Sequence, residues 1–161
     1  MYDLHCIMKH TCSILLCAAV ACLTCAPAEN APKTTMNTQI NYTEVSDYQA
    51  IRETIGLYLK GCSTGKSEDM KPAFLPEATM YWVENGELKG GPIQILFDGI
   101  DAMPGAGDQA AVVSSIVIEK NIAQARVETD KEGGPRYSDM FQLLKTKDGW
   151  KIISKIYCSQ R

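Results

Sequence analysis

Two polar side chains, a phenol and a carboxyl, lie in segments whose other residues favour burial. Tyr58 shares one face of an expected helix with Ile51 and Ile55. Asp139 alternates with Phe141 in a run typical of a strand. A phenol and a neutral carboxyl that face one apolar pocket can both donate hydrogen bonds to a developing oxyanion. We therefore treat Tyr58 and Asp139 as candidate catalytic and ligand-binding residues.

Each of these residues also has a purely structural interpretation. Tyr58 can be a core aromatic residue whose hydroxyl finds a local partner. Asp139 can be a structural carboxylate bonded to the neighbouring backbone or to Arg136. An unpartnered acid is costly to bury, so both interpretations of Asp139 stay open. The oxyanion hypothesis requires a protonated Asp139, which burial in an apolar pocket favours.

The first 28 residues differ in composition from the remainder of the chain. A basic start at Lys9, an apolar run at residues 14–21 and the small residues Ala26-Pro27-Ala28 predict a signal peptide over residues 1–28. Residues 29–43 are polar and without period, which predicts a flexible linker before a domain at 44–161. We expect a secreted or periplasmic protein. Residues 19–22 also resemble a lipoprotein box, in which Cys22 would carry a lipid anchor.

Removal of such a leader takes away five of seven cysteines and both histidines. Without an imidazole, Ser-His-Asp and Cys-His catalysis and histidine-ligated metal sites are excluded, and we expect no cofactor and no metal. Cys62 and Cys158 remain, either as one disulfide or as two separate thiols. A net charge of −3 without a basic run argues against a nucleic-acid partner. No later apolar stretch is long enough for a transmembrane segment.

The pattern along residues 44–161 changes from helical to strand-like. We expect helices at 46–61, 68–74 and 93–103, with Ser67 capping the second and Pro92 in the first turn of the third. Strands are expected at 79–83, 112–118, 122–129, 137–144 and 150–158, and Asn85-Gly86 predicts a hairpin turn after the first. Alternation in the last strand places Lys151 and Lys155 on the solvent face. This order predicts an α+β fold.

Several short motifs together resemble the NTF2-like superfamily, which includes SnoaL and the ketosteroid isomerases. They are Gly65-Lys66, residues 74–79 (FLPEAT), Pro92-Ile93, residues 137–143 (YSDMFQL) and residues 148–152 (DGWKI). The similarity covers about residues 44–157 and is closest to the group named as putative lumazine-binding. It implies a cone of three N-terminal helices packed on a curved, mostly antiparallel six-stranded sheet. It also implies a pocket between helices and sheet, and a homodimer.

The resemblance to ketosteroid isomerases extends to two of their three catalytic positions. Their oxyanion hole combines a tyrosine with a protonated aspartic acid, and these fall at Tyr58 and Asp139. Their general base falls at Trp82, whose indole cannot take a proton, and Glu84 is a weaker substitute at a hairpin end. Trp82 is interpreted as a pocket wall or a dimer contact.

The candidate residues indicate one leading function and two alternatives. The predicted ligand-binding residues are Tyr58, Trp82, Asp139 and Phe141. The leading function is the binding of a small apolar or aromatic ligand in the cone pocket. The alternatives are an isomerase or dehydratase that uses a Tyr/Asp oxyanion hole, and a non-catalytic dimerisation or docking domain.

Overall fold

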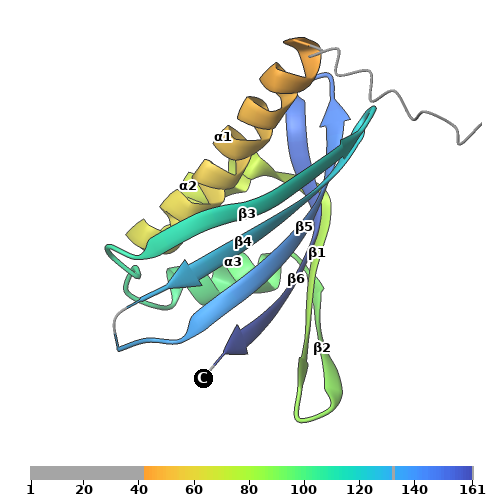
Figure 1. Cartoon of the computed structure of the whole chain (residues 1–161). Coiled ribbons are helices and arrows are strands. Elements are labelled where there is room, and N and C mark those ends of the chain that lie inside the picture. The colour runs from red at the N-terminus through yellow and green to blue at the C-terminus, as the bar shows by residue number, and fades with distance from the viewer. Residues whose placement is uncertain (1–41, 132, 161) are drawn as a thin grey trace, which may run out of the picture. The chain divides into compact units, whose positions relative to one another are not determined.

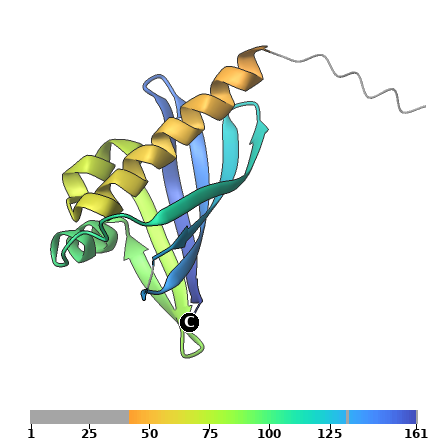
Figure 2. The same cartoon turned by 60° about the vertical axis from the view of Figure 1, so that its left-hand side comes forward.

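The long helix α1 (Tyr42–Thr64) runs along one face of the sheet in both views of the computed structural model (Figures 1 and 2). The structure describes residues 42–131 and 133–160, so the predicted signal peptide and residues 29–41 of the predicted linker lie outside it. The helix begins four residues earlier than expected and includes the last two residues of the predicted linker. Its apolar face is buried as predicted, because Ile51 and Ile55 have no exposed surface.

The other helical segments are short. They are α2 (Ser67–Met70), the 3₁₀ helix η1 (Lys71–Ala73) and α3 (Gln94–Asp101). The expectation of three helices packed on the sheet is therefore corrected to one long helix and minor ones. Ser67 does not cap α2 as predicted. Its hydroxyl donates to Asp101 Oδ2 over 2.6 Å and its backbone N–H donates to Oδ1 over 2.7 Å, which ties α2 to α3.

Six strands form one sheet in the order β2-β1-β6-β5-β4-β3. Their bounds are β1 (Phe74–Glu84), β2 (Glu87–Pro92), β3 (Ala110–Glu119), β4 (Ile122–Asp130), β5 (Arg136–Thr146) and β6 (Gly149–Gln160). All neighbours are antiparallel except β1 and β6, which confirms the mostly antiparallel α+β fold.

The β1–β2 hairpin has the turn that its sequence predicts. Asn85 and Gly86 adopt φ values of 52° and 80°, and a type I′ turn needs positive φ at both positions. Pro92 ends β2 and does not open α3, which corrects its predicted place.

A bulge in β6 reverses the faces of its later residues. Ile152 pairs with Leu143 and Ser154 pairs with Gln142, so Ile153 is an extra residue in the ladder. An inserted residue shifts the alternation of side chains by one position, which moves the following residues to the opposite face. Lys155 therefore points toward the helices and is only 3% exposed, and its predicted solvent-facing position is wrong.

We call the sheet face under α1 the inner face and the opposite one the outer face. The inner face carries the core, to which β4 and β5 contribute Ala123, Ala125, Val127, Phe141 and Leu143. The predicted alternation of β4 is confirmed, because its intervening residues Gln124 and Arg126 are exposed. Within the described residues no helix is both long and apolar enough to cross a membrane.

Candidate functional site

A cavity of about 440 Å³ lies on the inner face of the sheet, between α1, α3 and the segment that follows α3. This volume is in the range of small-molecule sites. Its walls are mostly aromatic and aliphatic, and include Met80, Trp82, Leu96, Ile100, Met103 and Tyr157. The few polar side chains in such a cavity therefore decide what it recognises.

Three polar side chains from three different elements meet at the wall of this cavity. Tyr58 from α1 donates its hydroxyl hydrogen to Asp139 Oδ2 of β5 over 2.7 Å. Lys155 from β6 donates from Nζ to Asp139 Oδ1 over 2.5 Å. The side chains of Lys155 and Asp139 are 4% and 2% exposed, so this ion pair is shielded from solvent. We call these residues the Tyr58–Asp139–Lys155 cluster.

The Lys155 ammonium also lies against aromatic rings. Its Nζ is 4.2 Å from the ring centroid of Tyr157, and 5.7 Å and 5.8 Å from those of Tyr58 and Phe141. Ring faces attract a desolvated cation and hold it in place. An ammonium has three N–H donors, and the bond to Asp139 uses one of them. The remaining donors can bond to the oxygen of a ligand in the cavity.

The proton arrangement of the cluster differs from the predicted oxyanion hole. Both oxygens of Asp139 accept hydrogen bonds from neighbouring side chains, so neither is placed as a donor toward the cavity. Burial, followed by the nearby negative charge of Asp139, raises the pKa of Tyr58 well above its usual value, so the phenol stays protonated. Arg136, the predicted alternative partner, pairs instead with Asp130 over 3.2 Å. The donor that the cluster presents to the cavity is Lys155, which sequence reasoning missed.

Two further predicted residues lie in different places. Trp82 lies on the cavity wall, where its ring centroid is 5.4 Å from that of Tyr157. Phe141 is fully buried, packs 5.0 Å from the ring of Tyr58 and is not among the described residues that line the cavity, so its contact with a ligand stays a prediction. Glu84 is exposed at the end of β1 and does not line the cavity. Among the described lining residues, Asp139 is the one carboxylate.

The two cysteines of the domain are both free thiols, which agrees with the alternative of two separate thiols and not with a disulfide. Cys62 lines the cavity, and burial raises its pKa to about 11, which leaves it a neutral thiol. Cys158 is exposed on the outer face. No group of three or more potential metal ligands occurs within residues 42–131 and 133–160.

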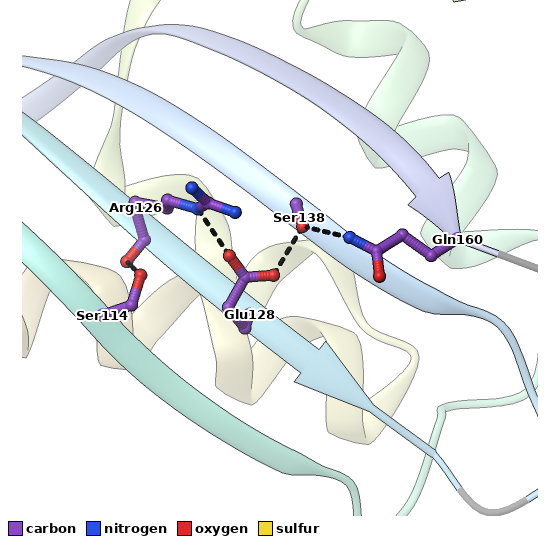
Figure 3. Close-up of polar contacts among 5 residues, drawn as sticks. All are labelled: Ser114, Arg126, Glu128, Ser138 and Gln160. Carbon is purple, nitrogen blue, oxygen red and sulfur yellow. Dashed lines mark hydrogen bonds and ion pairs between the residues drawn. The ribbon is translucent and has the colours of Figure 1, made fainter. Parts of the chain in front are cut away.

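The outer face carries a second polar network, which the sequence analysis did not predict (Figure 3). Glu128 accepts hydrogen bonds from Ser138 Oγ and Arg126 Nε, and Gln160 donates to Ser138 over 3.2 Å. The bond from Ser138 lowers the pKa of Glu128. A hollow of about 520 Å³ lies beside this network. We call these four residues the outer network.

Three comparisons place the chain among known proteins. The family described as putative lumazine-binding matches residues 46–158. Aldolase FrzH from Cladobotryum sp is 33% identical over 117 residues, which are 71% of this chain and 92% of that protein. An NTF2-like protein of unknown function from Shewanella baltica OS155 is 39% identical, with a TM-score of 0.71 over 75% of this chain and 99% of that one.

A second solved structure agrees with the first. The NTF2-like protein of unknown function from Methylobacillus flagellatus KT is 30% identical, with a TM-score of 0.68 over 73% of this chain and 94% of that one. The family match spans most of the chain and includes every residue of the Tyr58–Asp139–Lys155 cluster. The chain therefore belongs to the putative lumazine-binding family of NTF2-like proteins.

Proposed function

We propose that this protein binds a small, largely aromatic or apolar compound that carries a carbonyl oxygen. The observation that carries this proposal is the buried Tyr58–Asp139–Lys155 cluster at the wall of a largely apolar cavity. The aromatic walls take the body of the ligand, and the Lys155 ammonium donates to its oxygen. Such a bond is strong because the donor is charged and belongs to an ion pair that is shielded from solvent.

A matched pair of ligands tests this assignment. 2-Acetylnaphthalene and 2-ethylnaphthalene share their shape, but only the first carries a carbonyl group. We expect isothermal titration calorimetry to show tighter binding of the ketone. A Lys155→Met variant should weaken ketone binding about tenfold to a hundredfold, the usual value of a charged hydrogen bond. Binding of the hydrocarbon should stay unchanged.

The control for this experiment is Lys131→Met, which removes a different lysine from the cavity lining. Lys131 is exposed, whereas Lys155 is buried. Equal losses of ketone affinity in both variants would show a general effect of positive charge and contradict the assignment. Failure of the parent protein to bind either naphthalene would exclude the cavity as a ligand site.

A second candidate function, an aldol or retro-aldol reaction, is supported by the relative named Aldolase FrzH. Such reactions pass through a negatively charged oxygen, which the Lys155 ammonium would stabilise. The isomerase or dehydratase alternative has less support. Both oxygens of Asp139 already accept hydrogen bonds, and Trp82 occupies the place of the base in the isomerase resemblance. Measurement of aldehyde release from an aromatic β-hydroxy ketone tests the aldol function.

We also propose a homodimer through the outer face. Ile122, Met140 and Ile156 are 50%, 38% and 49% exposed there, beside the outer network. The network carries both Arg126 and Glu128, so a second copy related by two-fold symmetry can meet each charge with its opposite. Light scattering should find a dimer in the parent and a monomer in Met140→Lys. A monomeric parent protein would contradict the proposal.

Export is the remaining proposal about this chain. It depends on the composition of residues 1–28, which also allows a lipid at Cys22. Mass spectrometry of the N-terminus of the exported protein should find cleavage after Ala28. A lipidated Cys22 would point to membrane anchoring, and retention of residues 1–12 would contradict export through a cleaved leader.

A further inference from the structure

We propose that Lys155 is a covalent catalytic residue, whose amine forms an imine with the carbonyl carbon of the bound ligand. The inference rests on the proposed carbonyl-binding function and deepens it. Primary amines of lysine react in this way when they are desolvated in an apolar pocket beside a group that can take their proton. The surroundings of Lys155 provide both conditions.

Burial is the first condition. Lys155 is 3% exposed, and it is the buried lysine among the residues that the structure describes. Its side chain nevertheless reaches the cavity, because Lys155 belongs to the cavity lining together with Asp139 and Tyr157. Other lysines make their contacts at the surface, such as Lys151, which donates to the carbonyl of Pro72 over 2.6 Å.

A proton acceptor is the second condition. Asp139 Oδ1 lies 2.5 Å from Lys155 Nζ, close enough to take a proton directly. The other oxygen of Asp139 is held by Tyr58 over 2.7 Å, so the carboxyl group cannot turn away. Because the pKa of Tyr58 is raised, the phenol remains a hydrogen-bond donor to Asp139 while the lysine reacts.

The step balances without any further reagent. The Lys155 ammonium gives one proton to Asp139, and the lone pair of the free amine attacks the carbonyl carbon to form a C–N bond. The carbonyl C–O bond then breaks. Its oxygen leaves as water, with the proton from Asp139 and a second proton from the nitrogen of the adduct. A protonated imine and an ionised Asp139 remain, so the total charge equals that of the starting ammonium and carboxylate.

Such an intermediate agrees with the apolar lining of the cavity. Water hydrolyses imines, and walls such as Trp82, Leu96 and Ile100 limit its access. A protonated imine draws electrons from the neighbouring carbon atoms, which is the activation that forming or breaking a C–C bond next to a carbonyl requires. The inferred substrate class is therefore an aromatic or apolar ketone or aldehyde.

Two chemical probes test the inference on the intact protein. 1-Phenyl-1,3-butanedione converts a reactive lysine to a vinylogous amide, which has its own near-ultraviolet absorption. 2-Naphthaldehyde with sodium cyanoborohydride converts an imine to a stable secondary amine. We expect the absorption band to appear with one equivalent of dione, and peptide mass spectrometry to place the reduced adduct on Lys155.

Matched variants identify the reacting amine and its proton acceptor. Lys155→Arg keeps a cation opposite Asp139 but has no primary amine, so both signals should be lost. Lys131→Met, at the same cavity, should keep both signals. Asp139→Asn should slow formation of the absorption band about a hundredfold, as expected from loss of general acid–base assistance. Thermal unfolding curves identify variants that fail to fold.

The outcomes separate this inference from the function on which it rests. Binding of 2-acetylnaphthalene that depends on Lys155, without any adduct on Lys155, would overturn the imine and keep carbonyl binding. Adducts confined to Lys131 or surface lysines would also overturn it. If Lys155→Arg does not fold, peptide mapping of the parent protein alone decides which lysine carries the adduct.

Discussion

The two faces of the sheet each hold a pair of opposite charges, but the two pairs differ in how far solvent reaches them. On the inner face, Lys155 and Asp139 pair with side chains that are 4% and 2% exposed. On the outer face, Arg126 and Glu128 pair with side chains that are 48% and 33% exposed. Ser138 belongs to the outer network, and its neighbour in the same strand, Asp139, belongs to the inner cluster. The comparison teaches that solvent access, and not residue type, decides which pair matters to stability and binding.

The largest expected effect comes from breaking the inner ion pair. Asp139→Ala leaves the buried Lys155 ammonium without its partner, and we expect the free energy of unfolding to fall by about 3–5 kcal/mol. Urea denaturation followed by circular dichroism measures this change. The double variant Asp139→Leu/Lys155→Met removes both charges and should recover most of the stability. A double variant as unstable as the single one would contradict this account.

Packing should show nearly as strong a contrast between adjacent residues of β5. Phe141 is fully buried, whereas Met140 is 38% exposed on the outer face. We expect Phe141→Ala to lower the free energy of unfolding by about 3–5 kcal/mol, because it opens a cavity in the core. In dilute protein, where the proposed dimer dissociates, Met140→Ala should change it by less than about 0.5 kcal/mol. The same urea titrations measure both values, and equal losses would show that Met140 is covered in solution.

A single hydrogen bond of the inner cluster should have a smaller effect. Tyr58→Phe removes one donor to the buried Asp139, and we expect a loss of about 1–3 kcal/mol. Because the pKa of Tyr58 is raised in the folded protein, its contribution is complete below the ordinary tyrosine pKa of about 10. It is lost as pH rises through the folded-state value. Above pH 10, the free energy of unfolding measured by urea titration should therefore fall more steeply with pH for the parent protein than for Tyr58→Phe. Parallel curves would contradict the raised pKa.

The smallest effect is expected from the outer network. The pKa of Glu128 is lowered by the Ser138 hydroxyl and then by Arg126, so this contribution exists above the ordinary glutamate pKa and is lost as pH falls through the folded-state value. Glu128 is open to solvent, however, and screening weakens the interaction. In Met140→Lys, which cannot form the proposed dimer, we expect Glu128→Gln to leave the midpoint of urea unfolding at neutral pH unchanged. A clear shift in this monomer would show that the exposed pair stabilises the fold by itself.

Several local features could be predicted because neighbouring residues determine them. The helical spacing of Ile51, Ile55 and Tyr58 predicted the buried face of α1. Asn85-Gly86 predicted its hairpin turn from the backbone freedom of two residues. Alternation in β4 predicted its inner and outer residues. The order of the short motifs together predicted the superfamily.

The polar cluster could be predicted only in part. Helix phase, strand phase and the isomerase resemblance together predicted that Tyr58 and Asp139 lie at one pocket. The hydrogen bonds that Asp139 makes there depend on a third residue, Lys155. Lys155 was assigned to solvent because it lies four positions after Lys151 in an alternating strand. The consecutive isoleucines Ile152 and Ile153 interrupt that alternation, and they are the one local indication of the bulge. Two consecutive isoleucines also fit a regular strand that is half buried on both faces, so they do not identify the bulge by themselves.

The sequence by itself determined the α+β order of elements, the turn at Asn85-Gly86 and the element faces on which Tyr58 and Asp139 lie, because periodicity and backbone preference act over a few residues. Tertiary structure alone decided that Lys155 faces inward, that Asp139 accepts two hydrogen bonds and that Cys62 and Cys158 stay apart. These outcomes depend on the register between β5 and β6 and on the helix that covers them. Register is set by the packing of whole strands, so no single segment of the sequence encodes it.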